Sequence, residues 1–245
     1  MAKQSAKNGL VLIGGKNFSA QSLQWDANMT TNPAEVTGFG DTSHNFINTL
    51  KSGEVTLNML WDSSDKTESL LTTTEESNVT IVPGGYSLGA PSLSMPFYQA
   101  NCDISGSASG DAIQAGSMKF VTRGNVGGLE LGQVLHSSTI TVSTTDTGVT
   151  DPNQGTQEIT GACAGVLHVW LATTTDSYVV EIQESTDDIT YATLITFTLN
   201  GQALGSERVA RASANIEPYR RVVATRTGAA ADSFGFTVHF WHEGA

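Results

Sequence analysis

Side chains able to do chemistry are present in the chain, but they lack the spacing that catalysis requires. Asp41, Ser43 and His44 lie together in the stretch GFGDTSHNF, although neighbours in sequence do not adopt the geometry of a catalytic triad. The sequence contains no Gly-x-Ser-x-Gly elbow, no phosphate-binding loop and no His-Glu-x-x-His motif. We therefore expect a protein that is not an enzyme, with no catalytic residue and no cofactor.

Candidate metal ligands are equally sparse. Glu184, Asp187 and Asp188 crowd one predicted hairpin tip, where carboxylate oxygens could attract calcium, but a solvated turn is the more common structure for such a stretch. Cys102 and Cys163 have no metal-ligand spacing and fall in different predicted domains, so we expect two reduced thiols and no disulfide. The sequence thus predicts no metal site.

Two histidine–tryptophan pairs are the best candidates for a binding surface. His168 and Trp170 share one face of a predicted strand, and His239 and Trp241 share one face of another, while the intervening apolar residues form the natural core side. If these strands pair, the four rings would cluster as an outer aromatic patch. Three interpretations are open: ordinary cross-strand packing, a contact with a neighbouring subunit, or a platform for a glycan.

Five of the twelve basic residues fall in one span of the C-terminal part. They could form a local basic face, or they could pair with the acidic stretch 181–188 in the same domain or in a neighbouring subunit. Pairing within the domain is the more common arrangement. The five residues are Arg208, Arg211, Arg220, Arg221 and Arg226.

The composition indicates a β-rich, acidic protein. Hydrophobic residues make up 39% of the 245 residues and charged residues only 15%, so Ser, Thr, Asn, Gln and Gly must cover much of the surface. The formal charge of −12 disfavours tight binding of nucleic acid, which needs basic residues to neutralise phosphates. The apolar run at residues 10–13 is too short for a signal peptide, and no stretch could span a bilayer. We expect a chain made in the cytoplasm that does not associate with membranes.

The clearest predicted strand covers the stretch GEVTLNMLWD, at residues 53–62. Alternation gives it one apolar face and one polar face, which indicates an antiparallel sheet with one side buried and one side in water. The apolar face is formed by Val55, Leu57, Met59 and Trp61, and the polar face includes Thr56 and Asn58.

The fold class that these patterns predict is mainly β, with two domains. Residues 1–136 are predicted to form a β-barrel or β-sandwich domain with one short helix at 65–77, where Asp65 and Glu68 form a capping box. The Thr-rich residues 137–158 are interpreted as a linker or an edge strand. Residues 159–245 contain five short strands separated by turns, which favours a β-sandwich.

The order of these motifs resembles that of the tail tube proteins, or major tail proteins, of long-tailed bacteriophages. The resemblance covers roughly residues 10–135 and rests on the stretches TGFGD and FINTLKSGEVTLNMLWD, the helix, VTIVPGG and the closing FVTRGNVGGLELG. The C-terminal part is similar to the immunoglobulin-like or jelly-roll sandwich that such proteins often carry.

The resemblance implies a structural protein of the virion tail, in which rings of six copies stack into a hollow tube that delivers DNA to the host. The inner wall would be a β-barrel to which each subunit donates a few strands. Thr56 and Asn58 would then face the lumen, the apolar row from Val55 to Trp61 would pack the barrel wall, and DNA would pass without specific binding.

The same resemblance implies partners and a place of assembly. The partners would be other copies of the chain, a tape-measure protein, a tail terminator and baseplate or distal tail proteins, and assembly would occur in the host cytoplasm. The added sandwich favours a non-contractile tail. An alternative is a capsid-decoration or adhesion protein whose C-terminal sandwich binds a host glycan.

Overall fold

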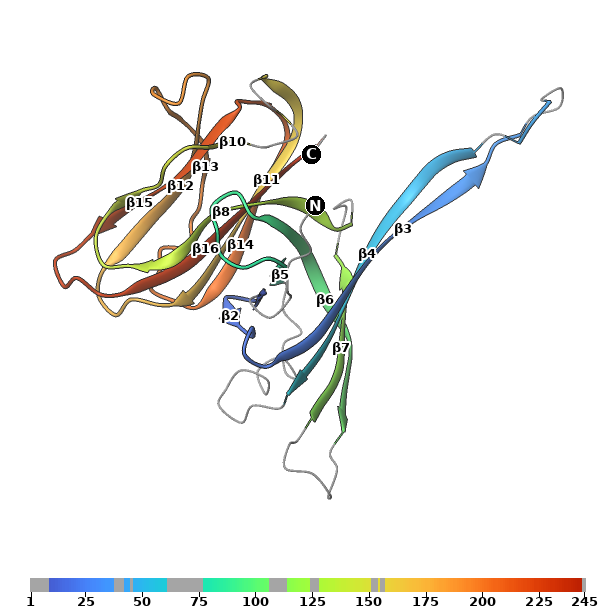
Figure 1. The fold of residues 1–245 in the computed structure, drawn as a ribbon, viewed down its shortest axis with the longest axis horizontal. Helices are drawn as coiled ribbons and strands as arrows, with labels where there is room; N and C mark the ends of the chain where they lie inside the picture. The colour runs from blue at the N-terminus through green and yellow to red at the C-terminus, as the bar shows by residue number, and fades with distance from the viewer. Residues whose placement is uncertain are drawn as a thin grey trace. The chain divides into compact units, whose positions relative to one another are not determined.

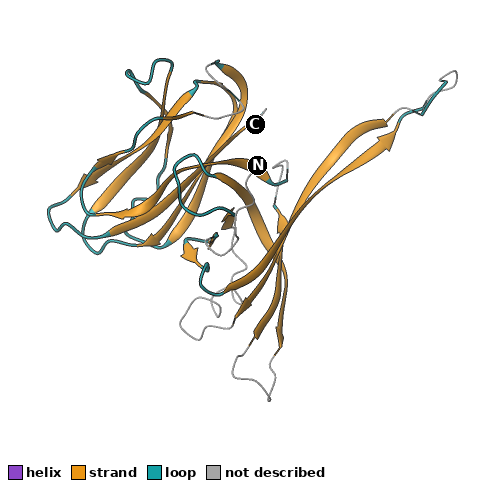
Figure 2. Cartoon of the chain, in the orientation of Figure 1, coloured by secondary structure: helices purple, strands orange, loops and turns teal. Residues whose placement is uncertain are grey.

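The computed structural model consists of strands and loops. It describes residues 9–37, 42–44, 46–60, 77–105, 114–123, 128–150, 154 and 157–243, and within these ranges it contains sixteen strands and no helix (Figure 2). Backbone pairing joins eleven strands into one antiparallel sheet and five into a second, and neither sheet closes into a barrel within this part of the chain. The prediction of a mainly β fold is confirmed.

Some of the expected features fall outside the described residues. The predicted helix at 65–77 lies there except for its last residue, and so do Trp61 and the residues 38–41 of the Gly-Phe-Gly-Asp turn. In the described part of the chain, no helix has the length and hydrophobicity needed to cross a membrane.

The chain forms two compact units that alternate along the sequence. Unit 1 comprises Met1–Ala20, Ser77–Ser94 and Glu130–Ala245, and unit 2 comprises Gln21–Glu76 and Met95–Leu129. This division differs from the predicted one, which separated residues 1–136 from residues 159–245. The reason is that segments of the N-terminal half pair with C-terminal strands, as β6 (Pro91–Ser105) does with β8 (Glu130–Ile140). The predicted linker at 137–158 contains two short strands, β9 (Thr144–Thr145) and β10 (Val149–Thr150), which pair with β15 (Tyr219–Thr227).

Unit 1 contains the predicted sandwich (Figure 1). Both of its sheets contribute to a core of seventeen buried apolar residues, among them Leu167, Tyr178 and Phe236. One sheet has the order β14-β11-β16-β8, and the other has the order β10-β15-β12-β13 with β9 beside β15. The strands are β8 (Glu130–Ile140), β9 (Thr144–Thr145), β10 (Val149–Thr150), β11 (Ile159–Leu171), β12 (Ser177–Ser185), β13 (Ala192–Thr196), β14 (Gly205–Ile216), β15 (Tyr219–Thr227) and β16 (Phe234–His242).

A further layer of unit 1, which we call the cover layer, consists of residues 10–20 and 77–94. It contains β1 (Leu10–Ile13), β2 (Lys16–Asn17), β5 (Ser77–Val82) and the start of β6 (Pro91–Ser105), and it continues the sheet of β8 in the order β6-β5-β1-β2. Its apolar side chains form a second, smaller cluster with Val134 of β8, and Trp170 of β11 packs against that cluster. The cover layer therefore packs on the face of the sheet that points away from the sandwich core.

Unit 2 is built on a four-stranded antiparallel sheet with the order β3-β4-β7-β6. Its strands are β3 (Ser22–Glu35), β4 (Phe46–Leu60), β7 (Gln114–Thr122) and the later part of β6. The pairing of β4 with β7 ends at Glu54. From there towards Phe46, β4 pairs with β3 alone, and the two strands form a ribbon (Figure 1).

Candidate functional site

The polar face of the unit 2 sheet contains Thr56 and Asn58, both partly exposed. Thr56 is paired with Asp26 of β3 on one side and with Lys119 of β7 on the other, and Asn101 of β6 lies opposite Lys119. The row thus runs across all four strands with short or polar side chains. Alternate residues of a strand point to opposite faces of a sheet. The alternation of polar and apolar residues in β4 therefore places the polar row on one face and the buried residues on the other.

The charges on this face are partly paired. Lys119 Nζ lies 2.7 Å from Glu54 Oε2, and Asn101 Nδ2 donates to Asp103 Oδ2 at 3.0 Å. The described part of the face carries three carboxylates, from Asp26, Glu54 and Asp103, the amine of Lys119, and the guanidinium of Arg123, which donates from Nε to Tyr98 Oη at 3.2 Å. A surface of this kind offers no row of free basic groups to hold phosphates.

The opposite face of the same sheet is apolar. Val55, Leu57 and Met59 are at most 1% exposed, and Leu57 lies in a row with Trp25 and Met118. Next to that row, the rings of Phe97 and Phe120 meet edge to face, with centroids 4.6 Å apart. The alternation in β4 therefore separates a buried face from a wet one, while a role of these residues in a barrel wall stays a prediction.

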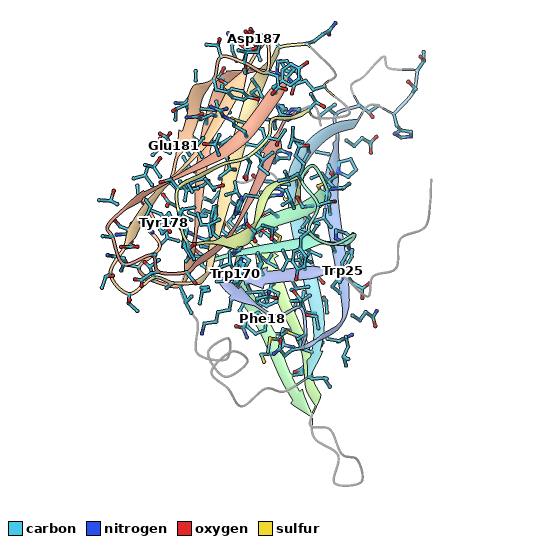
Figure 3. The ribbon with its side chains drawn as sticks, turned by 60° about the vertical axis from the view of Figure 1, so that its left-hand side comes forward. Phe18, Trp25, Trp170, Tyr178, Glu181 and Asp187 are labelled. Carbon is cyan, nitrogen blue, oxygen red and sulfur yellow. The ribbon has the colours of Figure 1, made fainter. Side chains whose placement is uncertain are left out.

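The described pairs of the two outer strands of this sheet each lie on one side within unit 2. In the described residues, β3 pairs with β4, and β6 pairs with β7 from Phe97 to Ser105. The apolar face is incompletely covered at the β3 edge, where Leu23 is 58% exposed and Met29 is 47% exposed, while Trp25 between them is half-buried (Figure 3). Long free edges with apolar side chains are normally covered by another chain.

Sequence reasoning did not find these edges. The alternation of β4 could have been extended to β3 and β7, but which strand ends a sheet depends on pairing between distant segments. The Lys119–Glu54 contact joins residues 65 positions apart and has no local signal in the sequence.

The predicted outer aromatic patch is corrected by the structure. His168, Trp170, His239 and Trp241 do lie on one face of β11 and β16, but both histidines are 0% exposed and both tryptophans are only partly exposed. The cover layer packs over this face, so it is an internal surface, and Trp170 (labelled in Figure 3) donates from Nε1 to Thr237 Oγ1 at 3.2 Å. A glycan platform made of these four rings is therefore wrong.

The two histidines are held in a buried polar network. The Nδ1 atom of His168 accepts from the backbone N–H of Gly15 at 3.4 Å, and its Nε2 atom lies 2.8 Å from Thr80 Oγ1. His239 Nδ1 lies 2.6 Å from Ser92 Oγ. Burial lowers the pKa of each imidazole to about 3, so both are neutral at pH 7.

The predicted cluster of arginines is spread over several contacts inside unit 1. Arg208 donates from Nε to Glu130 Oε2 at 3.1 Å and from Nη2 to Glu130 Oε1, and the carboxylate is 3% exposed. Arg221 donates to Gln183 Oε1 and stacks on Tyr191, with its Cζ 3.7 Å from the ring centroid.

Two more arginines have oxygens of unit 1 as partners, and Arg226 also lies 3.7 Å from the buried carboxylate of Asp176, measured from Nη1 to Oδ2. The buried Arg220 donates to Gln154 Oε1 at 2.7 Å, and Arg226 donates to the carbonyl of Thr141 at 2.5 Å. Four of the five arginines are thus engaged within the unit, and only Arg211 is an exposed side chain. These contacts lie within unit 1, with Glu130 and Asp176 as the carboxylates of the ion pairs, while pairing of the arginines with the carboxylates of 181–188 stays a prediction.

The acidic hairpin tip is a structural turn. Asp187 Oδ1 accepts from the backbone N–H groups of Ile189 and Thr190 and from the hydroxyl of Ser185, at 2.8–2.9 Å. These bonds lower the pKa of Asp187, since they stabilise its ionised form. No cluster of three or more metal-ligating side chains exists among the residues that the structure describes.

Comparisons with known proteins found similarity at the level of structure. The chain is similar to a protein in the virion of the native gene transfer agent particle, with 14% identity and a TM-score of 0.41 over 53% of this chain and 98% of that chain. It is similar to a protein in the tail of the empty gene transfer agent particle, which has C6 symmetry, with 13% identity and a TM-score of 0.39 over 50% and 96%.

A third similar structure spans almost the whole chain. It is the Dit protein of SPP1, described as a paradigm of the hub adsorption apparatus in phages that infect Gram-positive bacteria. The identity is 10% and the TM-score 0.37, over 96% of this chain and 98% of that chain. A scan of protein-family models and a search of curated proteins found no match.

Proposed function

We propose that this chain is a structural subunit of a phage-type tail, in which copies join edge to edge through the unit 2 sheet to form a ring around a channel. The observation that carries the proposal is the four-stranded sheet with two faces, whose outer strands β3 and β6 each have one partner strand in unit 2 among the described residues. Copies that pair β3 with β6 of the next copy around a ring would satisfy both edges and would cover the apolar side chains of Leu23 and Met29.

The strand directions allow this pairing to repeat around a ring. Neighbouring strands in the sheet are all antiparallel and the sheet has four strands, so β6 runs antiparallel to β3. Rotation about an axis along the channel preserves strand direction, and β6 of one copy would therefore meet an antiparallel β3 of the next. The contact is head to tail, which generates a closed ring when the rotation closes.

The expected width of the channel favours six copies. With strands about 4.8 Å apart and tilted by about 40°, six copies would form a wall about 48 Å across between backbones and roughly 38 Å between side chains. Three copies would leave only about 14 Å between side chains by the same estimate. A B-form DNA duplex passes through the first channel and not through the second.

The polar face of the sheet is the one that we assign to the lumen. Thr56 and Asn58 would line it together with Asp26, Asn101 and Lys119, while the buried row of Val55, Leu57 and Met59 would hold the wall against the outer layers. Paired and acidic groups on this face would let DNA slide during its delivery to the host. The β3–β4 ribbon, whose described side chains are largely exposed, would contact a neighbouring ring.

Rings of this kind would stack into a tube, and we assign the chain to the virion tail after assembly in the host cytoplasm. A tape-measure protein, a tail terminator and baseplate or distal tail proteins would be its partners. A single ring at the distal end of the tail is the other position open to such a subunit. Negative-stain electron microscopy at rising protein concentration distinguishes long tubes from isolated six-fold rings.

Disulfide trapping tests the edge pairing directly. Cys102 lies on β6, in the same cross-strand row as Leu57 and Met118, while Cys163 is 1% exposed and therefore protected. A cysteine introduced singly at Leu23, Trp25, Ala27 or Met29 should form a disulfide with Cys102 of the next copy in at least one variant. Oxidised samples should then show a ladder of up to six bands on a non-reducing gel.

The controls use the same chain. The ladder should disappear in a Cys102→Ser background, and Asp26→Cys, which places the thiol on the opposite face, should not give one. Hollow assemblies in which none of the four positions forms a ladder would overturn the edge pairing. Closed compact dimers or trimers without a channel, seen by microscopy, would overturn the proposed function.

The lumen assignment has its own test. Thr56→Lys combined with Asn58→Lys should slow DNA ejection from purified virions several-fold, because each copy would add two positive charges to the channel wall. Tube formation should continue, since both side chains are partly exposed. Thr193→Lys combined with Thr225→Lys, at two exposed positions on β13 and β15 of unit 1, is the matched charge control. Unchanged ejection with tubes of normal length would show that the face does not line the channel.

A further inference from the structure

The cover layer is held on β11 and β16 by apolar packing and by polar contacts. Its cluster with Val134 contains five buried residues, and further apolar residues of the layer are also buried, namely Val11, Ile13, Phe18, Val79 and Ile81. The polar contacts that reach β11 and β16 are centred on His168 and His239. A buried polar group that loses its hydrogen bond keeps its full cost of desolvation, so the state of these two rings affects how firmly the layer is held.

The first of these contacts is a chain of hydrogen bonds through His168. The backbone N–H of Gly15 donates to His168 Nδ1, so the ring proton must sit on Nε2, which donates to Thr80 Oγ1. The hydroxyl of Thr80 then donates to Ser94 Oγ at 3.0 Å, and Ser94 donates to the carbonyl of Val79 at 3.2 Å. The N–H of Gly15 and the carbonyl of Val79, at the two ends of this series, determine which atom donates in every bond between them. All the bonds can form together only while His168 is neutral.

The second contact joins His239 of β16 to Ser92 of β6. The Nε2 atom of His239 is buried and has no hydrogen-bond partner among the described residues. The charged and titratable groups around the two rings are the other ring, Arg208 of β14 and Glu130 of β8, and Arg208 already forms an ion pair with Glu130. Among the described residues, the cover layer contributes the hydroxyls of Thr80, Ser92 and Ser94 and the backbone N–H of Gly15, none of which is an anion that could pair with an added positive charge.

We propose that the cover layer is an acid-released latch, which detaches from β11 and β16 when His168 and His239 bind protons while the sandwich stays folded. A proton on His168 Nδ1 replaces its acceptor site with a donor and breaks the bond from Gly15. A proton on His239 creates a cation beside Arg208 at a position that is 0% exposed to solvent. Both changes are relieved when the cover layer opens and water reaches the rings.

The direction of the pH effect follows from the two states. Burial lowers the pKa of both imidazoles from 6.5 to about 3, so the open state binds protons more strongly than the closed state. The stability that the neutral rings contribute is fully present above pH 6.5. It is lost progressively as the pH falls from 6.5 towards 3, and this is the range in which the latch opens.

Amide hydrogen exchange of the full chain tests the proposal, with rates corrected for the intrinsic effect of pH. Between pH 7 and pH 4, protection of the β5 amides should fall at least tenfold, while protection of β12 and β15 should change less than threefold. His168→Gln with His239→Gln should remove most of this pH dependence, because neither side chain can be protonated. His44→Gln, which removes an exposed imidazole, should leave it unchanged.

Two results would overturn the latch. One is a parallel loss of protection in β5 and β12, which would mean that unit 1 opens as a whole. The other is the same pH dependence in the double variant. If the double variant does not fold, an NMR titration of the histidine resonances in the wild-type protein tests the proposal instead. Titration of His168 and His239 near pH 6.5 without any loss of β5 protection would contradict it.

Discussion

Arg208→Ala is expected to lower the free energy of unfolding by about 3–5 kcal/mol at pH 8, because it leaves a buried carboxylate without its partner. Glu130 is 3% exposed, and both of its oxygens accept from the guanidinium of Arg208. An ionised carboxylate that loses such a partner keeps its full cost of desolvation. Chemical denaturation of the wild type and the variant measures the difference.

The loss should shrink as the pH falls. Burial raises the pKa of Glu130 even with Arg208 present, and removal of the guanidinium raises that pKa further. The folded variant then binds a proton more strongly than the unfolded chain, so its stability relative to the wild type increases as the pH drops through this pKa. Protonated Glu130 is neutral and costs less to bury.

Arg211→Ala is the matched control for this prediction. Arg211 lies on the same strand, β14, but its side chain is exposed, and a change there should stay within about 0.5 kcal/mol. Equal losses for the two alanine variants would show that the Glu130–Arg208 pair contributes no more than a surface arginine does.

Gly132→Ala is expected to have the second large effect, a destabilisation of about 3 kcal/mol or more. A Cβ atom at Gly132 would lie 2.1 Å from the carbonyl oxygen of Phe240 and 2.8 Å from Cε1 of His239. The nearer atom belongs to the backbone of the neighbouring strand β16, so it cannot move away without breaking the pairing of β8 with β16. The midpoint of thermal unfolding should fall by several degrees or more.

Gly205→Ala provides the comparison at another glycine in a strand. Its Cβ would meet only the side chain of Leu199, at 3.7–3.8 Å, which is ordinary contact. This variant should be neutral or slightly stabilising, because alanine restricts the unfolded chain. If both glycine variants unfold at the same temperature, the close approach of β8 to β16 is not what excludes a side chain at position 132.

The sequence predicted correctly which side chains of a strand are buried and which are exposed, where one side of the strand meets water. In β4, the alternation of Val55, Leu57 and Met59 with Thr56 and Asn58 separates buried from partly exposed positions as expected. The same rule placed His168 and His239 on the side of the sheet opposite the sandwich core. It failed on exposure, because alternation shows which face a residue occupies and does not show whether a second layer covers that face.

A signal for the second layer was present in the sequence. In β5 and β16, nearly every residue is buried, and the stretch FGFTVHFWH of β16 is an almost continuous run of apolar or aromatic residues, while SNVTIV of β5 is half polar and has no such signal. Such runs are typical of strands covered on both sides. The pairing of β6 with β8, which places the cover layer, joins segments about 40 residues apart and is decided by packing that no local pattern records.

The interleaving of the two units limits how this protein can change by recombination. The chain passes between unit 1 and unit 2 four times, at residues 20, 76, 94 and 129. No single crossover point in the gene would exchange one unit and leave the other whole, and a fragment that begins after residue 136 would lose most of β8 together with the cover layer. A crossover at residue 129 would carry every strand of the sandwich, since β8 to β16 are consecutive, but it would leave the cover layer with the other parent. Such a recombinant should fold only where the two parents share the side chains that join the cover layer to β11 and β16.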